Sequence, residues 1–228
     1  MKTSLIALTA VIAGAHLATA GDIVGKISLK GTPPAEKPLP LDPGCGKLHP
    51  TKPTTRFYVS EAGGVGDVFI TLKGVSGKST GASAAAHPID QKGCEYLPYV
   101  SAAQTGQKIA VKNSDPVLHN VHPTPTVAGN PEANKAQLPK GPDLIFSFNN
   151  AEEFLRFKCD VHPWMFSYVS IVDHPYFAVS AANGSYKISG VPDGKYTVVI
   201  KHRKAGTAEK EIEVKGGSVT ADFELEAK

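Results

Sequence analysis

The chain has 228 residues, of which 41% are hydrophobic and 20% charged, and its formal net charge is +3. This length allows one large or two small domains. A weak net charge, without a Lys/Arg stripe or a phosphate-binding Gly-rich loop, argues against nucleic acid as a partner.

The first twenty residues have the features of a secretory signal peptide. Lys2 provides a positive start, a short apolar stretch runs over residues 5–13, and Ala18-Thr19-Ala20 before Gly21 fits a cleavage site. The apolar stretch is too short for a spanning helix, and no later segment is suitable. We therefore expect a signal peptide over residues 1–20 and an exported, soluble, periplasmic protein without a membrane span. An uncleaved N-terminal anchor is the alternative.

From Gly21 onward the sequence shows strand signals and almost no helical ones. Apolar or alternating runs between Gly, Pro and Asn turns predict strands over residues 23–29, 57–59, 68–72, 94–101, 107–113, 143–148, 153–159 and 165–172. Within 94–101, Pro98 is expected on the unpaired side of an edge strand. Residues 35–55 and 124–141 are rich in Pro and Gly and predict long loops.

The tail continues the same pattern. Residues 183–188 and 191–200 read as strand, tight turn, strand, and residues 211–214 and 219–225 add two more. The basic run 201–204 is expected to be a solvated hairpin tip. Turns every eight to twelve residues are typical of sandwiches, so the predicted fold class is all-β.

The three cysteines are informative because their number is odd. Cys45 and Cys94 each follow a Gly in turn-like surroundings and are natural partners in an oxidising compartment. A disulfide closing about fifty residues would stabilise the fold by roughly 4 kcal/mol in the chain-entropy account. This pairing leaves Cys159 as a free thiol that a metal would protect. The alternative is that Cys159 pairs with one of the other two.

One short loop gathers three possible metal ligands of graded softness. Cys159, His162 and Met165 offer a thiolate, an imidazole and a thioether. A mononuclear copper electron-transfer site uses Cys and His ligands with a weak axial Met. The missing imidazole has two upstream candidates, His119 and His122. They lie three residues apart in an extended segment, so they face opposite ways and only one can bind the same metal.

The loop Cys159–Met165 resembles the amicyanin-like ligand loop of cupredoxins, the small type 1 copper proteins. The segment His119-Asn120-Val121-His122 resembles the same family's upstream ligand segment. The resemblance covers roughly residues 87–172 and is close only at these two segments. It implies a cupredoxin-like Greek-key β-sandwich that binds one copper ion per chain, with the ligands His119, Cys159, His162 and Met165.

Other residues have weaker roles in this prediction. The backbone N–H of Asn120 is expected to donate to the Cys159 sulfur, and its side chain to connect the two loops. His122 is favoured as a plain surface residue, and Trp164 either packs against the sandwich or belongs to a docking patch. An inert buried Cys159 and a structural zinc site are the alternatives, although Met is a poor zinc ligand. The remaining histidines are too scattered for the extra copper centres of an oxidase or nitrite reductase, so no enzyme activity is predicted.

The tail, with Asn183-Gly184-Ser185-Tyr186 followed by residues 191–196, resembles carboxypeptidase-regulatory-like β-sandwiches. Those domains usually open with a strand like residues 22–27. The resemblance implies N-terminal strands over 21–84 that are completed by 176–228, with the copper domain, 85–175, inserted between them. Two sequential domains are the alternative. The whole arrangement resembles exported proteins described as methylamine-utilisation-like.

Three functions follow from these predictions. The first is an exported type 1 copper protein that carries single electrons between redox protein partners of unknown identity. The second is a periplasmic copper carrier or scavenger aided by His122, and the third is a structural or surface-interaction protein with a residual metal site. The oligomeric state stays open.

Overall fold

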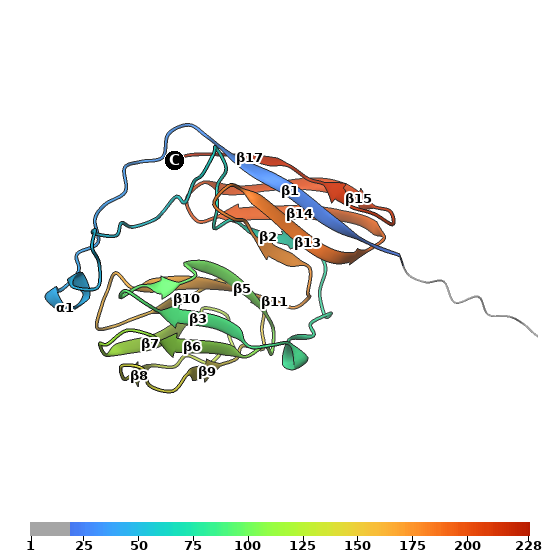
Figure 1. Cartoon of the computed structure of the whole chain (residues 1–228). Helices are drawn as coiled ribbons and strands as arrows, with labels where there is room; N and C mark the ends of the chain where they lie inside the picture. Colours follow the sequence, from blue (N-terminus) through green and yellow to red (C-terminus); the bar gives the residue numbers. More distant parts are fainter. Residues whose placement is uncertain (1–18) are drawn as a thin grey trace, which may run out of the picture.

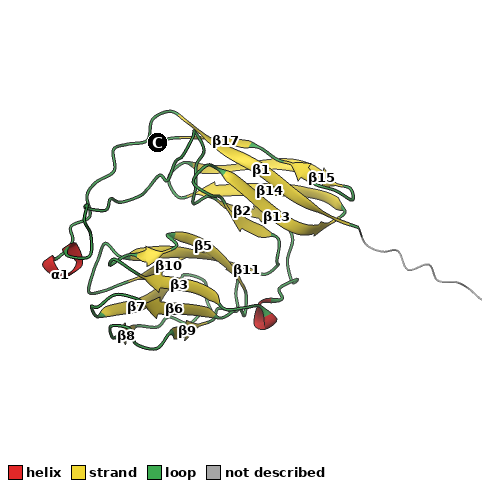
Figure 2. Cartoon of the chain, in the orientation of Figure 1, coloured by secondary structure: helices red, strands yellow, loops and turns green. Residues whose placement is uncertain are grey.

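The computed structural model describes residues 19–228, so the predicted signal peptide, 1–20, lies outside the described residues except for its last two. The described part consists of seventeen strands, one short α-helix and one 3-10 turn, and Figure 2 shows strands and loops almost throughout. The all-β prediction is therefore confirmed. No helix in the described part is long and apolar enough to cross a membrane.

One sandwich combines the N-terminal strand with the C-terminal part of the chain. Its first sheet contains β1 (Ala20–Lys30), which pairs antiparallel with β13 (Ser185–Pro192) and parallel with β16 (Val219–Thr220) and β17 (Phe223–Glu226). In Figure 1 the blue β1 lies among orange and red strands. The second sheet has the order β12-β2-β14-β15, with bounds Phe177–Val179, Phe69–Leu72, Gly194–His202 and Gly206–Val214.

The side chains of β1 explain its central place in this sandwich. Ile23 and Ile27 are fully buried in the core, as expected for apolar residues on the inward face of a strand. Gly25 lies so close to the neighbouring chain that a Cβ atom there would come within 2.2 Å of the Ala221 carbonyl oxygen. The absence of a side chain at this position lets the two segments approach.

The other sandwich is built from the middle of the chain. Its five-stranded sheet has the order β5-β11-β10-β7-β8, with bounds Val100–Gln104, Phe166–Val172, Glu152–Lys158, His119–Thr124 and Lys135–Gln137. Its four-stranded sheet has the order β4-β3-β6-β9, with bounds Tyr96–Leu97, His87–Gln91, Ile109–Asn113 and Leu144–Phe146. A separate hydrophobic core, centred on Phe148, Phe157 and Leu155, fills it. The division into 21–84, 85–175 and 176–228 stays a prediction.

Residues 31–67 form a long connection that we call the arm. The arm leaves β1, runs beside the middle sandwich and returns to β2 (Figure 1). It contains the helix α1 (Pro43–Gly46), which the Asp42 side chain caps by accepting from the Cys45 N–H. The disulfide Cys45–Cys94 ties the arm to the middle sandwich, so the predicted pairing is present.

Several local predictions were wrong. Residues 57–59 form no strand: they belong to the arm and join none of the described sheets. The segment 94–101 is divided at Pro98 into β4 and β5, which lie in different sheets. The basic run 201–204 is not a solvated tip throughout: His202 is buried, and the Arg203 guanidinium lies 3.3 Å from the ring centroid of Tyr168. The aromatic surface of the other sandwich explains this packing.

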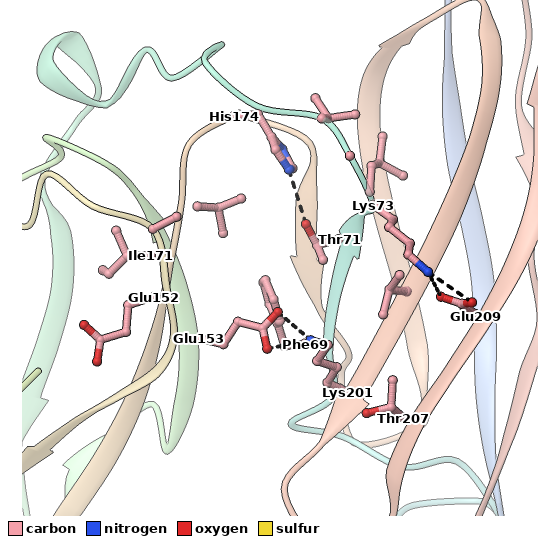
Figure 3. A pocket seen from close by; sticks show the side chains of 16 residues that line it. Phe69, Thr71, Lys73, Glu152, Glu153, Ile171, His174, Lys201, Thr207 and Glu209 are labelled. Atoms are coloured by element: carbon pink, nitrogen blue, oxygen red, sulfur yellow. Dashed lines mark hydrogen bonds and ion pairs between the residues drawn. The ribbon is translucent and has the colours of Figure 1, made fainter. Parts of the chain in front are cut away.

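A cleft of about 550 Å³ lies where the two sandwiches meet, and Figure 3 shows its side chains. Two ion pairs lie in it: Lys201 binds Glu153 at 2.6 Å across the two sandwiches, and Lys73 binds Glu209 at 3.0 Å. His174 lies 3.4 Å from the Thr71 hydroxyl. None of the predicted metal ligands lines this cleft, so the candidate site lies elsewhere.

Candidate metal centre

The predicted ligands come from two neighbouring strands and the loop that follows one of them. His119 begins β7, and Cys159 directly follows β10, which pairs antiparallel with β7. His162 and Met165 lie in the loop between β10 and β11. The Met165 N–H donates to the His162 carbonyl at 2.8 Å, and the Cys159 N–H donates to the Met165 carbonyl at 3.0 Å. These bonds close the loop tightly and direct its side chains to the end of β7.

Three donor atoms meet at this place. The Nδ1 atoms of His119 and His162 are 3.0 Å apart, and the Cys159 sulfur lies 3.7 Å from His162 Nδ1. One ligand atom from each of these three residues lies within 4.8 Å of the others. Their exposed fractions are 0%, 2% and 5% for His119, Cys159 and His162, and Met165 is equally buried in the same core.

Each imidazole uses its outer nitrogen to bind a carboxylate. His119 Nε2 lies 2.9 Å from Asp115 Oδ2, and His162 Nε2 lies 3.2 Å from Asp42 Oδ2. A carboxylate behind a metal-binding histidine orients the ring and fixes which nitrogen carries the proton. Here both rings are held with Nδ1 facing the shared space. The geometry therefore fits a metal bound through both Nδ1 atoms.

Sequence reasoning missed both carboxylates. Asp115 lies in the turn just before His119, and its position four residues upstream was an available signal. Asp42 belongs to the arm, and it reaches His162 because the arm is joined to the middle sandwich beside the ligand loop, in part by the disulfide. No spacing rule connects a residue of the arm with a loop so far along the chain.

Asn120 joins the two ligand-bearing segments. Its backbone N–H donates to the Cys159 sulfur at 3.3 Å, and its side-chain oxygen accepts from the Asp160 N–H at 3.0 Å. Its amide nitrogen also donates to Asn134. Hydrogen bonds to a ligating sulfur change its electron density and so affect the redox potential of a bound metal.

The pKa shifts of the three donors follow from their burial and from their contacts with one another and with Asp115. Burial raises the pKa of the Cys159 thiol, but hydrogen bonds with His119 and with the Asn120 N–H outweigh burial and place it below its ordinary value. Burial lowers the pKa of His119, but Asp115 and Cys159 outweigh it and raise that pKa. Burial and the neighbouring His119 lower the pKa of His162. The Asp115 carboxylate and the Cys159 sulfur, which raise the pKa of His119, would also favour a metal cation in the shared space.

The donor set distinguishes between metals. A thiolate and two imidazoles, with a thioether on the same loop, match the ligands of copper electron-transfer sites. Structural zinc sites use four Cys or His ligands. The other two cysteines, Cys45 and Cys94, are joined in the disulfide, and Cys159 is the free cysteine. The residues present therefore fit copper better than zinc.

The other predicted residues lie around this centre. His122 faces away from the donors and binds Asp160 at 2.7 Å and Glu132 at 2.8 Å. Trp164 is half-buried: its indole N–H donates to the Cys94 carbonyl at 3.1 Å, and its ring lies 5.2 Å from that of His162. These contacts support the packing interpretation of Trp164, and its role in docking stays a prediction.

No family model and no curated protein matches the chain. Among solved structures, it is similar to the Cu(I) form of a mutant of amicyanin, with 20% identity and a TM-score of 0.34 over 45% of this chain and 97% of that chain. It is also similar to the Cu-containing nitrite reductase (NirK) of Thermus scotoductus, with 17% identity and a TM-score of 0.35 over 44% of this chain. The match spans only 25% of that enzyme.

Proposed function

We propose that this protein is an exported, cupredoxin-like type 1 copper protein that carries single electrons between redox partners. The observation that carries the proposal is the buried meeting of His119, Cys159 and His162, with both outer imidazole nitrogens bound to carboxylates. Met165 is the proposed weak axial ligand. A bound copper ion would supply a one-electron couple between its monovalent and divalent states.

The chain's own residues suit this role because they hold the ligands in place. Asp115 and Asp42 orient the imidazoles, Asn120 links the two ligand segments, and the loop from Cys159 to Met165 is closed by its own backbone. Burial keeps water from the ligand atoms. A centre whose ligands do not move when the charge of the ion changes transfers electrons with little rearrangement.

A partner would approach the exposed side of the ligand segments. Val161 precedes His162 and is 52% exposed, and Leu118 precedes His119 and is 41% exposed. Both exposed apolar side chains adjoin a proposed ligand in the sequence, so an electron partner that contacts them would come close to the metal. We therefore propose that the electron partner docks near these residues.

A titration of the oxidised apo protein with Cu²⁺ tests the proposal. We expect one copper ion per chain and an intense visible band from the Cys159 thiolate. Cys159→Ser should abolish the band, whereas the matched control His122→Ala should keep it, because His122 faces away from the donors. Stoichiometric copper binding without the band would refute the proposed site.

The same ligands would serve a copper carrier, so the titration is followed by a transfer experiment. An electron carrier retains its copper when mixed with a competing apo-protein and exchanges electrons rapidly with a redox dye. Rapid loss of copper to the competitor, with slow electron exchange, would favour the carrier.

A further inference from the structure

Two more groups of possible ligands lie directly against the first site. Asp42, Cys45 and His162 form one group, and Cys94, Asp115 and His119 form the other. Within each group one ligand atom per residue lies within 4.8 Å of the other two. The Cys45–Cys94 disulfide therefore sits beside both imidazoles of the first site. Neither sulfur binds a metal while the disulfide is intact.

The positions of these donors do not depend on the disulfide alone. Three contacts besides the disulfide join the arm to the middle sandwich. His49 Nε2 contacts the Gly93 carbonyl, and Arg56 pairs with Glu95. Asp42 Oδ2 lies 3.2 Å from His162 Nε2. Asp115 accepts from the N–H groups of Gly93 and Cys94 at 2.6 and 2.7 Å. None of these contacts, nor the bond from the Trp164 indole to the Cys94 carbonyl, uses a sulfur atom, so we expect them to remain when the sulfur–sulfur bond is broken. The two thiols would thus stay close together.

We propose that the Cys45–Cys94 disulfide masks a second metal site, which binds monovalent copper when the disulfide is reduced. The reductant is a thiol of small-molecule or protein origin: two RSH groups give up two electrons and two protons, the protein disulfide becomes two thiols, and RS–SR forms. Cu⁺ then displaces the thiol protons and is held by Cys45 and Cys94. His162 and His119 are the adjoining imidazoles.

The donors suit this ion. Soft thiolates bind Cu⁺ or Zn²⁺ and release their protons on binding, but a structural Zn²⁺ would require both imidazoles as well, and these are ligands of the first site. Both sulfurs are fully buried, which protects bound Cu⁺ from water and oxygen. Reforming the disulfide removes both thiolates at once. The cysteine pair therefore has a reduced state with two ligating thiolates and an oxidised state without them, and these states differ by two electrons.

A Cys159→Ser chain separates this site from the first one, because it lacks the thiolate of the proposed electron-transfer centre. It is prepared once under anaerobic reductant and once oxidised, and a thiol count identifies the reduced form. Cu⁺ is then offered in competition with a chromophoric Cu⁺ chelator. We expect the reduced form to bind one Cu⁺ per chain, at least about 100-fold more tightly than the oxidised form.

The matched control is the reduced triple variant Cys45→Ser, Cys94→Ser, Cys159→Ser, which should bind Cu⁺ as weakly as the oxidised single variant. Equal binding by the reduced single and triple variants would overturn the proposal, as would binding of Zn²⁺ but not Cu⁺ by the reduced single variant.

A second measurement uses the unmutated chain in case the variants fold poorly. Cu⁺ should protect Cys45 and Cys94 of the reduced protein from alkylation, as mapped by mass spectrometry, and alkylation of both despite bound Cu⁺ would contradict the proposal. The proposed electron-transfer function fails by a different result: the oxidised, unmutated protein binds Cu²⁺ without the visible band.

Discussion

Replacing Asp115 with Asn tests how the metal centre is held in place. Asp115 is almost fully buried, and its two oxygens accept three hydrogen bonds. Oδ1 accepts from the Gly93 N–H at 2.6 Å, while Oδ2 accepts from the Cys94 N–H at 2.7 Å and contacts His119 Nε2 at 2.9 Å. Asn keeps one of these oxygens and puts an amide NH₂ in place of the other. In either orientation, one N–H donor faces another.

The size of the effect follows from that conflict. A buried donor left without an acceptor costs about 1–3 kcal/mol, so we expect the Asp115→Asn protein to lose that much free energy of unfolding. The weaker orientation of His119 should also reduce copper affinity by about 10–100-fold, as is usual when the partner of a metal-binding histidine is lost. Urea unfolding of the apo protein and a copper-chelator competition measure the two effects.

Asp42→Asn is the matched control, because Asp42 contacts the other imidazole but its side chain is 42% exposed. Water can satisfy its groups, so the loss of stability should stay below about 1 kcal/mol while copper affinity still falls. If Asp115→Asn unfolds like the parent protein, or if neither variant binds copper more weakly, the carboxylates do not orient the ligands as argued.

Three further predictions concern other parts of the fold. Removing the disulfide by Cys45→Ser with Cys94→Ser should cost up to about 4 kcal/mol, because the bond closes a loop with a sequence separation of 49; urea unfolding that matches the parent protein would contradict this. Burial lowers the pKa of His202 to about 4. Between pH 6.5 and 4 the unfolded chain binds a proton at this ring and the folded chain does not, so about 3 kcal/mol of unfolding free energy, fully present above pH 6.5, is lost as the pH falls toward 4. His202→Asn, which keeps an acceptor for the Ala205 N–H, should remove that part of the pH dependence in unfolding measured between pH 4 and 7.5. Arg203→Met should lower the unfolding free energy by about 1 kcal/mol through loss of the cation–π contact with Tyr168, and a neutral result would show that the contact is compensated by solvation.

The sequence predicted the fold class and most strands because their signals are local. Alternation in residues 23–29 and 107–113 corresponds to β1 and β6. The prediction failed where tertiary context decided the outcome. Residues 57–59 have strand-forming side chains but no partner strand, and the segment 94–101 is divided between two sheets. Neither outcome can be seen in the segment itself.

The same difference between local patterns and tertiary contacts applies to the candidate site. Its residues His119, Asn120, Cys159 and His162 lie in two short segments whose order and spacing are visible in the sequence. Asp42 comes from the arm, and its contact with His162 depends on how the disulfide places α1. The Lys201–Glu153 pair and the packing of Arg203 likewise depend on how two sandwiches meet. Patterns within one segment contain no information about such contacts.

The arm deserves to be considered as part of the metal centre rather than as a connection. Without it, His162 would lose its carboxylate partner and the cover that Asp42 and Cys45 provide on its outer side. The disulfide fixes the arm to Cys94, whose N–H binds the carboxylate that orients His119. One covalent bond thus supports the outer hydrogen bonds of both imidazoles. Breaking that bond should therefore change metal binding as well as lower the stability of the fold.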